Sequence, residues 1–151
     1  MELSGAARRF VEQAPVGRLA TVDAHGMPHI VPVCFALVGD RLYSVVDQKS
    51  KRTTRLQRLR NIEANPGAAL VIDRYSDDWS ELAWVMVRGG ASVIESGEEY
   101  AQALTALREK YPQYRSMQLD GRPMIRLSAD RVTGWGIQDG SEDGSGDSSA
   151  G

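Results

Sequence analysis

The sequence lacks long hydrophobic runs. No apolar stretch in the chain approaches the roughly 18 residues that a membrane-spanning helix needs. The N-terminal segment MELSGAARRF also lacks the apolar region that follows the charges of a secretory signal peptide. We therefore expect a cytoplasmic protein that does not contact the membrane.

Cysteine and histidine are scarce. Cys34 is the single cysteine, so an internal disulfide is excluded, and its place in the apolar run IVPVCFALV predicts a buried filler rather than a reactive thiol. The two histidines, His25 and His29, are separated by Gly26 and Pro28. They are therefore expected to flank a turn rather than share a helix face, and we expect no metal site.

An excess of either charge is also missing, since 18 Lys and Arg residues face 20 Asp and Glu residues and give a net charge of −2. General nucleic-acid binding is not expected, because it needs a broad positive field. The length fits one domain, which we place at residues 1–138. Residues 139–151, DGSEDGSGDSSAG, form an acidic Gly/Ser tail that we expect to be disordered.

Apolar residues recur at helical spacing in three segments. Residues 3–14 form an amphipathic pattern, and residues 53–64 alternate leucines with basic side chains. Residues 98–111, EEYAQALTALREKY, begin with acids and end with bases, as the helix dipole favours. We expect a helix in each segment.

Short β-branched or aromatic runs between turn residues predict strands. RLATVD, HIVPVCFALV and RLYSVVD should form three strands in two hairpins, because Gly26 and Gly39-Asp40 permit the positive φ of tight turns. Pro32 predicts an edge, a bulge or a ligand contact in the second strand. Further strands are expected at AALVID, at LAWVMVRGGASVIES with a bend at Gly89-Gly90, and at PMIRLSA and RVTGWGI. This order favours a closed antiparallel barrel with peripheral helices over βαβ units.

Basic residues gather in the segment DQKSKRTTRLQRLRN. If a helix begins near Ser50, then Lys51, Arg55 and Arg58 share one face at its N-terminal end. Free backbone N–H groups at a helix start suit a phosphate, whereas the alternative is a solvated basic face. The cluster follows a strand end and lacks interspersed acids, but the spacing alone leaves both interpretations open.

No local signature of nucleophilic catalysis is present. The sequence has no G-x-S-x-G motif, and the acids of the loop DRYSDDWSE are typical of a solvated loop. An anion-binding segment without an acid–base constellation is what a redox-cofactor protein requires, because the cofactor supplies the difficult chemistry.

Several motifs follow one another in the order found in one superfamily. Gly26-Met27-Pro28 precedes Pro32-Val33, and the N-x-x-x-N-P segment from Asn61 to Pro66 leads into the next predicted strand. From about Pro15 to Trp135 the chain resembles the flavin and deazaflavin oxidoreductases of the pyridoxamine 5′-phosphate oxidase-like superfamily. Their fold is the mainly β, FMN-binding type of split β-barrel, here with six to seven antiparallel strands expected.

The W-S-x-L-x-W pattern from Trp79 to Trp84 is similar to the actinobacterial branch that uses the deazaflavin F420. The resemblance therefore implies an F420-dependent oxidoreductase that acts on a small organic substrate as a homodimer. FMN is the alternative cofactor, although HIVPVCFAL lacks the Arg and Lys that hold the flavin phosphate in pyridoxamine phosphate oxidases. Vitamin B6 oxidation is not expected. A non-catalytic carrier of a cofactor or of haem, with His25 or His29 as the haem ligand, is the alternative function.

The resemblance also implies where the cofactor binds, at two sites on the subunit interface. The ring would lie along the second strand, and tryptophans of the partner subunit would approach it. The residues implied for the phosphate are Ser50, Lys51, Arg55, Arg58 and Asn61; those for the ring are Val31, Pro32 and Val33; the tryptophans are Trp79 and Trp84.

Overall fold

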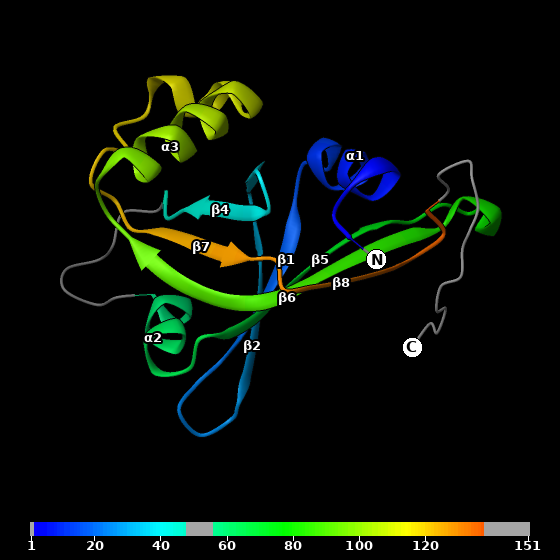
Figure 1. The fold of residues 1–151 in the computed structure, drawn as a ribbon, viewed down its shortest axis with the longest axis horizontal. Coiled ribbons are helices and arrows are strands. Elements are labelled where there is room, and N and C mark those ends of the chain that lie inside the picture. The colour runs from blue at the N-terminus through cyan, green and yellow to red at the C-terminus, as the bar shows by residue number, and fades with distance from the viewer. Residues whose placement is uncertain (1, 48–55, 138–151) are drawn as a thin grey trace.

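A computed structural model of the chain describes residues 2–47 and 56–137 (Figure 1). The predicted tail at 139–151, and Ser50, Lys51 and Arg55 of the basic segment, lie outside the described residues. Along the described chain the elements are α1 (Gly5–Gln13), β1 (Gly17–Val22), β2 (Pro28–Val33), β3 (Ala36–Val38), β4 (Arg41–Val45), α2 (Gln57–Ala64), β5 (Gly67–Arg74), η1 (Trp79–Glu81), β6 (Ala83–Ile94), α3 (Glu98–Lys110), η2 (Pro112–Ser116), β7 (Met124–Ser128) and β8 (Arg131–Trp135).

The strands form one antiparallel sheet that curls into a split β-barrel, which confirms the predicted fold class. Their order is β2-β1-β5-β6-β7-β4-β3, and β8 pairs with β6. In the described residues β2 and β3 are the two ends of this path, so the barrel is open between them rather than closed as expected. Figure 1 shows β6 as a long curved strand with β5 and β8 along one half and β7 along the other.

The run HIVPVCFALV forms two strands, so the prediction of a single strand here is wrong. β2 ends at Val33 and β3 begins at Ala36, and these strands belong to opposite ends of the sheet. The hydroxyl of Tyr111 accepts a hydrogen bond from the Phe35 N–H at 3.1 Å and donates to the Pro15 carbonyl at 2.9 Å. Between β2 and β3, the Phe35 N–H therefore bonds to a side chain instead of to a neighbouring strand.

The tight turns follow the sequence prediction. Gly26 has a φ of +85° between β1 and β2, and Gly39 has a φ of +61° between β3 and β4. Pro32 lies on β2 opposite Arg18, and β2 is an edge of the described sheet, so the edge position expected from proline is confirmed.

Two groups of buried apolar side chains form the core. The larger lies among α1, α2 and the inner faces of β1, β5 and β6, and the smaller lies between α3 and the strands β3, β4 and β7. In Figure 1, α1 and α3 lie on one side of β6 and α2 lies on the other. Among the described residues no helix is long and apolar enough to cross a membrane.

Helix α2 starts later than the sequence predicts. Leu56 is extended, with ψ at 151°, and the helix begins at Gln57. A continuous helix that runs from Ser50 or from Thr53 through Leu56 is therefore wrong. The apolar side of α2 is as expected, because Leu59 and Ile62 are buried in the larger core group.

The bend of β6 depends on the lack of a side chain at one position. A Cβ atom placed on Gly89 would lie 1.8 Å from the carbonyl oxygen of Ser128, at the end of β7. The neighbouring Gly90 has nothing within 4 Å of such an atom. The close approach of β6 to the β7–β8 turn therefore requires glycine at position 89 and not at position 90.

We predict that Gly89→Ala destabilises the fold by about 3 kcal/mol or more, because the methyl group forces the β7–β8 turn away from β6. Gly90→Ala is the matched control and should change stability by about 1 kcal/mol or less. Urea unfolding followed by tryptophan fluorescence measures both. Equal midpoints for the two variants would contradict this account of the bend.

Candidate functional site

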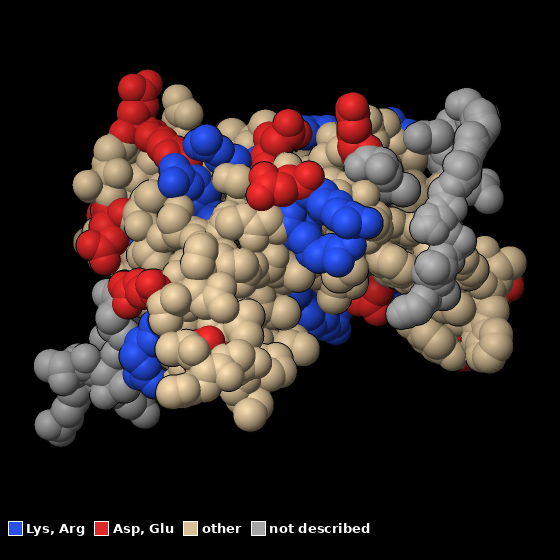
Figure 2. Space-filling model, turned by 60° about the horizontal axis from the view of Figure 1, so that its bottom comes forward, with Lys and Arg blue, Asp and Glu red and all other residues tan. Residues whose placement is uncertain are grey.

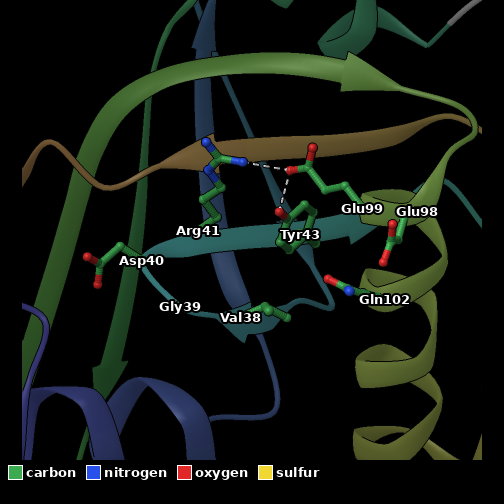
Figure 3. Close-up of a pocket in the computed structure, with 8 residues that line it drawn as sticks. All are labelled: Val38, Gly39, Asp40, Arg41, Tyr43, Glu98, Glu99 and Gln102. Atoms are coloured by element: carbon green, nitrogen blue, oxygen red, sulfur yellow. Dashed lines mark hydrogen bonds and ion pairs between the residues drawn. The ribbon is translucent and has the colours of Figure 1, made fainter.

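A first surface pocket lies between the β3–β4 hairpin and the start of α3 (Figure 3). Its volume is about 510 Å³, and it is lined by Val38, Gly39, Asp40, Arg41, Tyr43, Glu98, Glu99 and Gln102. Figure 3 shows the Arg41 guanidinium and the Tyr43 hydroxyl both turned toward the Glu99 carboxylate. Their distances to Oε2 are 3.0 Å and 2.5 Å, and Arg126 Nη1 lies 2.8 Å from Oε1.

These contacts give the first pocket a structural role. The hydrogen bond from Tyr43, with the two arginines, lowers the pKa of Glu99. The carboxylate therefore stays charged and ties β4 and β7 to α3. Because the arginine that lines the pocket is already paired with this carboxylate, the pocket is a weak candidate for binding an anion.

The second pocket is the candidate functional site. Its volume is about 420 Å³, within the usual range for small-molecule sites. It is lined by Val16, Val31, Pro32, Val33, Cys34, Ser44, Val45, Asp47, Arg58 and Tyr114. Strand β2 supplies an apolar wall, β4 supplies a second wall, and α2 supplies the arginine. The structure thus brings together four of the residues implied for the cofactor, the three of β2 and Arg58.

Arg58 is the cation of this pocket. Its Nε atom is buried and has no hydrogen-bond partner among the described residues. Burial lowers the pKa of Arg58, and the nearby Asp47 carboxylate opposes that effect. A guanidinium remains protonated through such a shift, so a partly desolvated positive charge with an unused donor faces the pocket. Buried donors in native proteins are normally paired, so this one indicates a missing acceptor.

Asp47 and Tyr114 form the acidic side of this pocket. The Tyr114 hydroxyl donates to Asp47 Oδ2 at 2.6 Å, and Arg122 Nη1 donates to the Asp47 carbonyl at 2.6 Å. Burial and the hydrogen bond to Asp47 raise the pKa of Tyr114, so its proton stays on the phenol. The sequence did not indicate either residue as functional. Asp47 is the last residue of the predicted strand RLYSVVD, and an acid at a strand end could have indicated a site, whereas nothing in the sequence pattern marks Tyr114.

The thiol of Cys34 also reaches this pocket. The side chain is partly buried, packs against the smaller core group and lines the pocket, so it is less enclosed than the sequence predicts. Close by, Lys110 Nζ lies 3.8 Å from the centre of the Phe35 ring and is buried without a hydrogen-bond partner. Burial lowers the pKa of Lys110 to about 8.

The other residues implied for the cofactor lie elsewhere. Asn61 is 1% exposed, and its Nδ2 donates to Thr21 Oγ1 at 3.0 Å, which joins α2 to β1. Trp79 lies in η1 with 69% of its surface exposed, and Trp84 lies on β6 opposite Trp135 of β8. None of the three lines either pocket. Ser50, Lys51 and Arg55 are outside the described residues.

Charge and potential metal ligands give no further site. On the face seen in Figure 2, acidic and basic side chains lie interspersed above a broad uncharged area. His25 is exposed in the β1–β2 turn and His29 lies on β2. In the ranges 2–47 and 56–137, no group of three or more His, Cys, Asp and Glu side chains is arranged to hold a metal ion.

Comparison with known proteins places this chain in a family. The family model described as pyridoxamine 5′-phosphate oxidase matches residues 3–136. A protein of Streptomyces rimosus named 5a,11a-dehydrotetracycline/5a,11a-dehydrooxytetracycline reductase is 31% identical over 123 residues, which cover 81% of this chain and 75% of that protein.

Solved structures with the same fold have more distant sequences. The heme storage protein HutZ from Vibrio cholerae is 18% identical with a TM-score of 0.67, and the match covers 87% of this chain and 94% of that one. A heme-binding protein from Mycobacterium smegmatis is 24% identical with a TM-score of 0.71, covering 88% and 53%. A putative pyridoxamine 5′-phosphate oxidase from Listeria innocua is 18% identical with a TM-score of 0.62, covering 83% and 91%. At these identities the likeness concerns the fold.

The position of Asn61 leads to a test of its role. Asn61→Ala should destabilise the protein by roughly 2 kcal/mol, because it leaves the buried Thr21 hydroxyl without its partner. Thr21→Val should cost a similar amount. The double variant should cost less than the two single losses together, since one hydrogen bond is removed in each case. If the loss of unfolding free energy in the double variant, measured with urea, equals the sum of the two single losses, the two side chains act independently.

Proposed function

The chain belongs to the pyridoxamine 5′-phosphate oxidase family, and we propose that within it the protein is an oxidoreductase that uses the deazaflavin F420. The observation that carries the proposal is the buried, unpartnered Nε of Arg58 in a pocket walled by β2. The reductase name of the Streptomyces rimosus relative supports the reaction class. FMN, the alternative cofactor, offers the same combination of a flat ring and a phosphate.

The pocket suits a flat ring that carries an anion. Val31, Pro32 and Val33 form an apolar wall on an edge strand, where proline leaves no N–H to pair. Arg58 faces the same space with an unused donor, which fits a phosphate oxygen. Lys51 and Arg55, with Ser50, would extend this grip, as the family resemblance implies. The fit therefore rests on both an apolar surface and a positive charge in one pocket.

The protein's own part in the reaction is orientation and exclusion of water. Bound F420 would supply hydride transfer to or from an electron-poor double bond. Strand β2 would hold one face of the ring, and Arg58 would fix its phosphate end, so that the reacting atoms meet in one geometry. The apolar wall and the buried hydroxyl of Tyr114 would limit the access of solvent.

A haem carrier is the second candidate function. His29 lies on β2, two residues from Val31 of the pocket wall, and its buried Nδ1 has no hydrogen-bond partner in the part of the chain that the structure describes. An imidazole nitrogen without a partner could serve as an iron ligand. Titration with haemin, followed by the Soret band, distinguishes the two functions. Haemin binding that is lost in His29→Ala, together with no F420 binding, would favour the carrier.

We predict that Arg58→Ala weakens F420 binding about 10- to 100-fold, because a charge-assisted contact to phosphate contributes about 1.5–3 kcal/mol. Arg60→Ala is the matched control, since Arg60 is an exposed arginine of the same helix. It should weaken binding less than about threefold at moderate ionic strength. The measurement is an absorbance titration at constant salt. Equal effects of the two variants, or no binding by the wild type, would contradict the proposal.

We also propose that the protein is a homodimer, joined through the outer face of the sheet. The side chains of β5 and β6 that point into the barrel are buried in the core. Because successive side chains of a strand point to opposite faces, the residues that alternate with them point to the outer face of the sheet. Val71 and Met86 are paired there, and Met86 in turn faces Thr133. None of these three belongs to a core group, and the nearby Ile30 is 64% exposed. A second copy would remove this apolar surface from water.

Val71→Lys should therefore convert the dimer to a monomer, because it places a charge in the middle of the buried face. Ile30→Lys, on exposed edge strand β2, tests the same face with less risk to folding. Ala101→Lys, on an exposed position of α3, is the control and should leave the mass unchanged. Light scattering after size-exclusion chromatography gives the mass. A wild-type monomer, or dimers for both face variants, would refute this interface.

A further inference from the structure

We propose that Asp47 shifts the selectivity of the Arg58 pocket toward a singly charged phosphodiester and away from a doubly charged phosphomonoester. The inference rests on the proposed function, in which this pocket holds the phosphate of a cofactor. It goes further, because it assigns the choice between cofactor classes to one side chain.

Asp47 and Arg58 are the two charged side chains among the described residues that line this pocket. Their charges oppose each other, so the described wall offers no net positive charge to a ligand. The Asp47 carboxylate also favours the charged form of Arg58, which shows that the two groups interact. An anion that enters gains attraction from the guanidinium and meets repulsion from the carboxylate.

The carboxylate of Asp47 is held in place and cannot easily turn away from an anion. The hydroxyl of Tyr114 donates to its Oδ2 at 2.6 Å, and Tyr114 is buried. Arg122 Nη1 donates to the backbone carbonyl of the same residue at 2.6 Å, which fixes the main chain. The negative charge is therefore a permanent part of the pocket wall rather than a mobile surface group.

The repulsion depends on the charge of the ligand. A phosphomonoester carries between one and two negative charges at neutral pH, with a second pKa of about 6, whereas a phosphodiester carries one. The unfavourable interaction with Asp47 is therefore nearly twice as large for the monoester. Cations elsewhere in the chain add attraction to both ligands but do not change this contribution of Asp47. FMN is a phosphomonoester, and F420 carries its phosphate as a diester.

The test uses two ligands that share one ring, FMN and its monomethyl phosphate ester. Asp47→Asn removes the charge but keeps an oxygen that can accept from Tyr114. We expect this variant to bind FMN roughly tenfold more tightly than the wild type, and the methyl ester roughly threefold more tightly. Riboflavin, which has no phosphate, should bind equally to both proteins. Flavin fluorescence at constant pH and salt measures all three affinities.

Asp77→Asn is the matched control, because Asp77 is an exposed acid outside the pocket. It removes the same charge and should leave the preference between the two esters unchanged. If Asp47→Asn does not fold, Tyr114→Phe provides a second route. That variant frees the carboxylate from its hydrogen bond and should shift the preference toward FMN in the same direction, by a smaller factor.

The possible failures can be told apart. An equal gain for both esters in Asp47→Asn, or no gain for either, overturns the role of Asp47. The proposed function is refuted separately, if Arg58→Ala leaves the affinity for FMN, its methyl ester and F420 at the wild-type values. A monoester preference that rises in Asp47→Asn and not in Asp77→Asn supports the inference.

Discussion

The whole arrangement depends on the close approach between β6 and the turn that follows β7. At Gly89 the backbone passes so near the Ser128 carbonyl that no side chain fits. This contact lets one continuous strand pair with β5 and β8 along its first part and with β7 along its second. Because β6 belongs to both halves of the split barrel, this one strand connects the two groups of core side chains.

The candidate site lies where the chain crosses between these halves. The β2 wall ends at Val33, and after Cys34 and Phe35 the chain enters β3 at the other end of the sheet. The second wall comes from β4, which ends at Val45, shortly before Asp47. The pocket therefore takes its apolar side from one half of the barrel and its acidic side from the other. Arg58 enters from α2, whose position on β1 depends on the hydrogen bond between Asn61 and Thr21.

Much of the fold could be predicted from local sequence patterns, because turns and amphipathic helices need particular residues at nearby positions. The turn glycines and the amphipathic helices follow from residues close in sequence, and the Gly89-Gly90 pair marks the bend of β6. The break between β2 and β3 could not be predicted in this way. It depends on the Tyr111 hydroxyl, which meets Phe35 from a distant part of the chain. An apolar run cannot report a hydrogen bond made by a side chain 76 positions away.

Only part of the lining of the candidate pocket could be predicted, for the same physical reason. The β2 wall and Arg58 meet as the family motifs imply, whereas Asn61 is used to hold α2 against β1. From the sequence alone, a polar residue beside a basic cluster could either bind a phosphate or join two elements of the fold. Only its burial in the structure distinguishes these two roles. Asp47 and Tyr114 come together from positions 67 residues apart, so their contact has no local pattern.

The hydrogen bonds of Tyr111 at the crossover between β2 and β3 affect how the pocket responds to a bound molecule. Tyr111 follows directly on α3, and its hydroxyl bonds to the backbone of Phe35, next to the thiol that lines the pocket. A molecule that pushes Cys34 outward must therefore strain this bond and the end of the helix behind it. By thermodynamic linkage the effect is reciprocal. A change that stabilises the end of α3 therefore weakens the binding of any molecule that displaces Cys34.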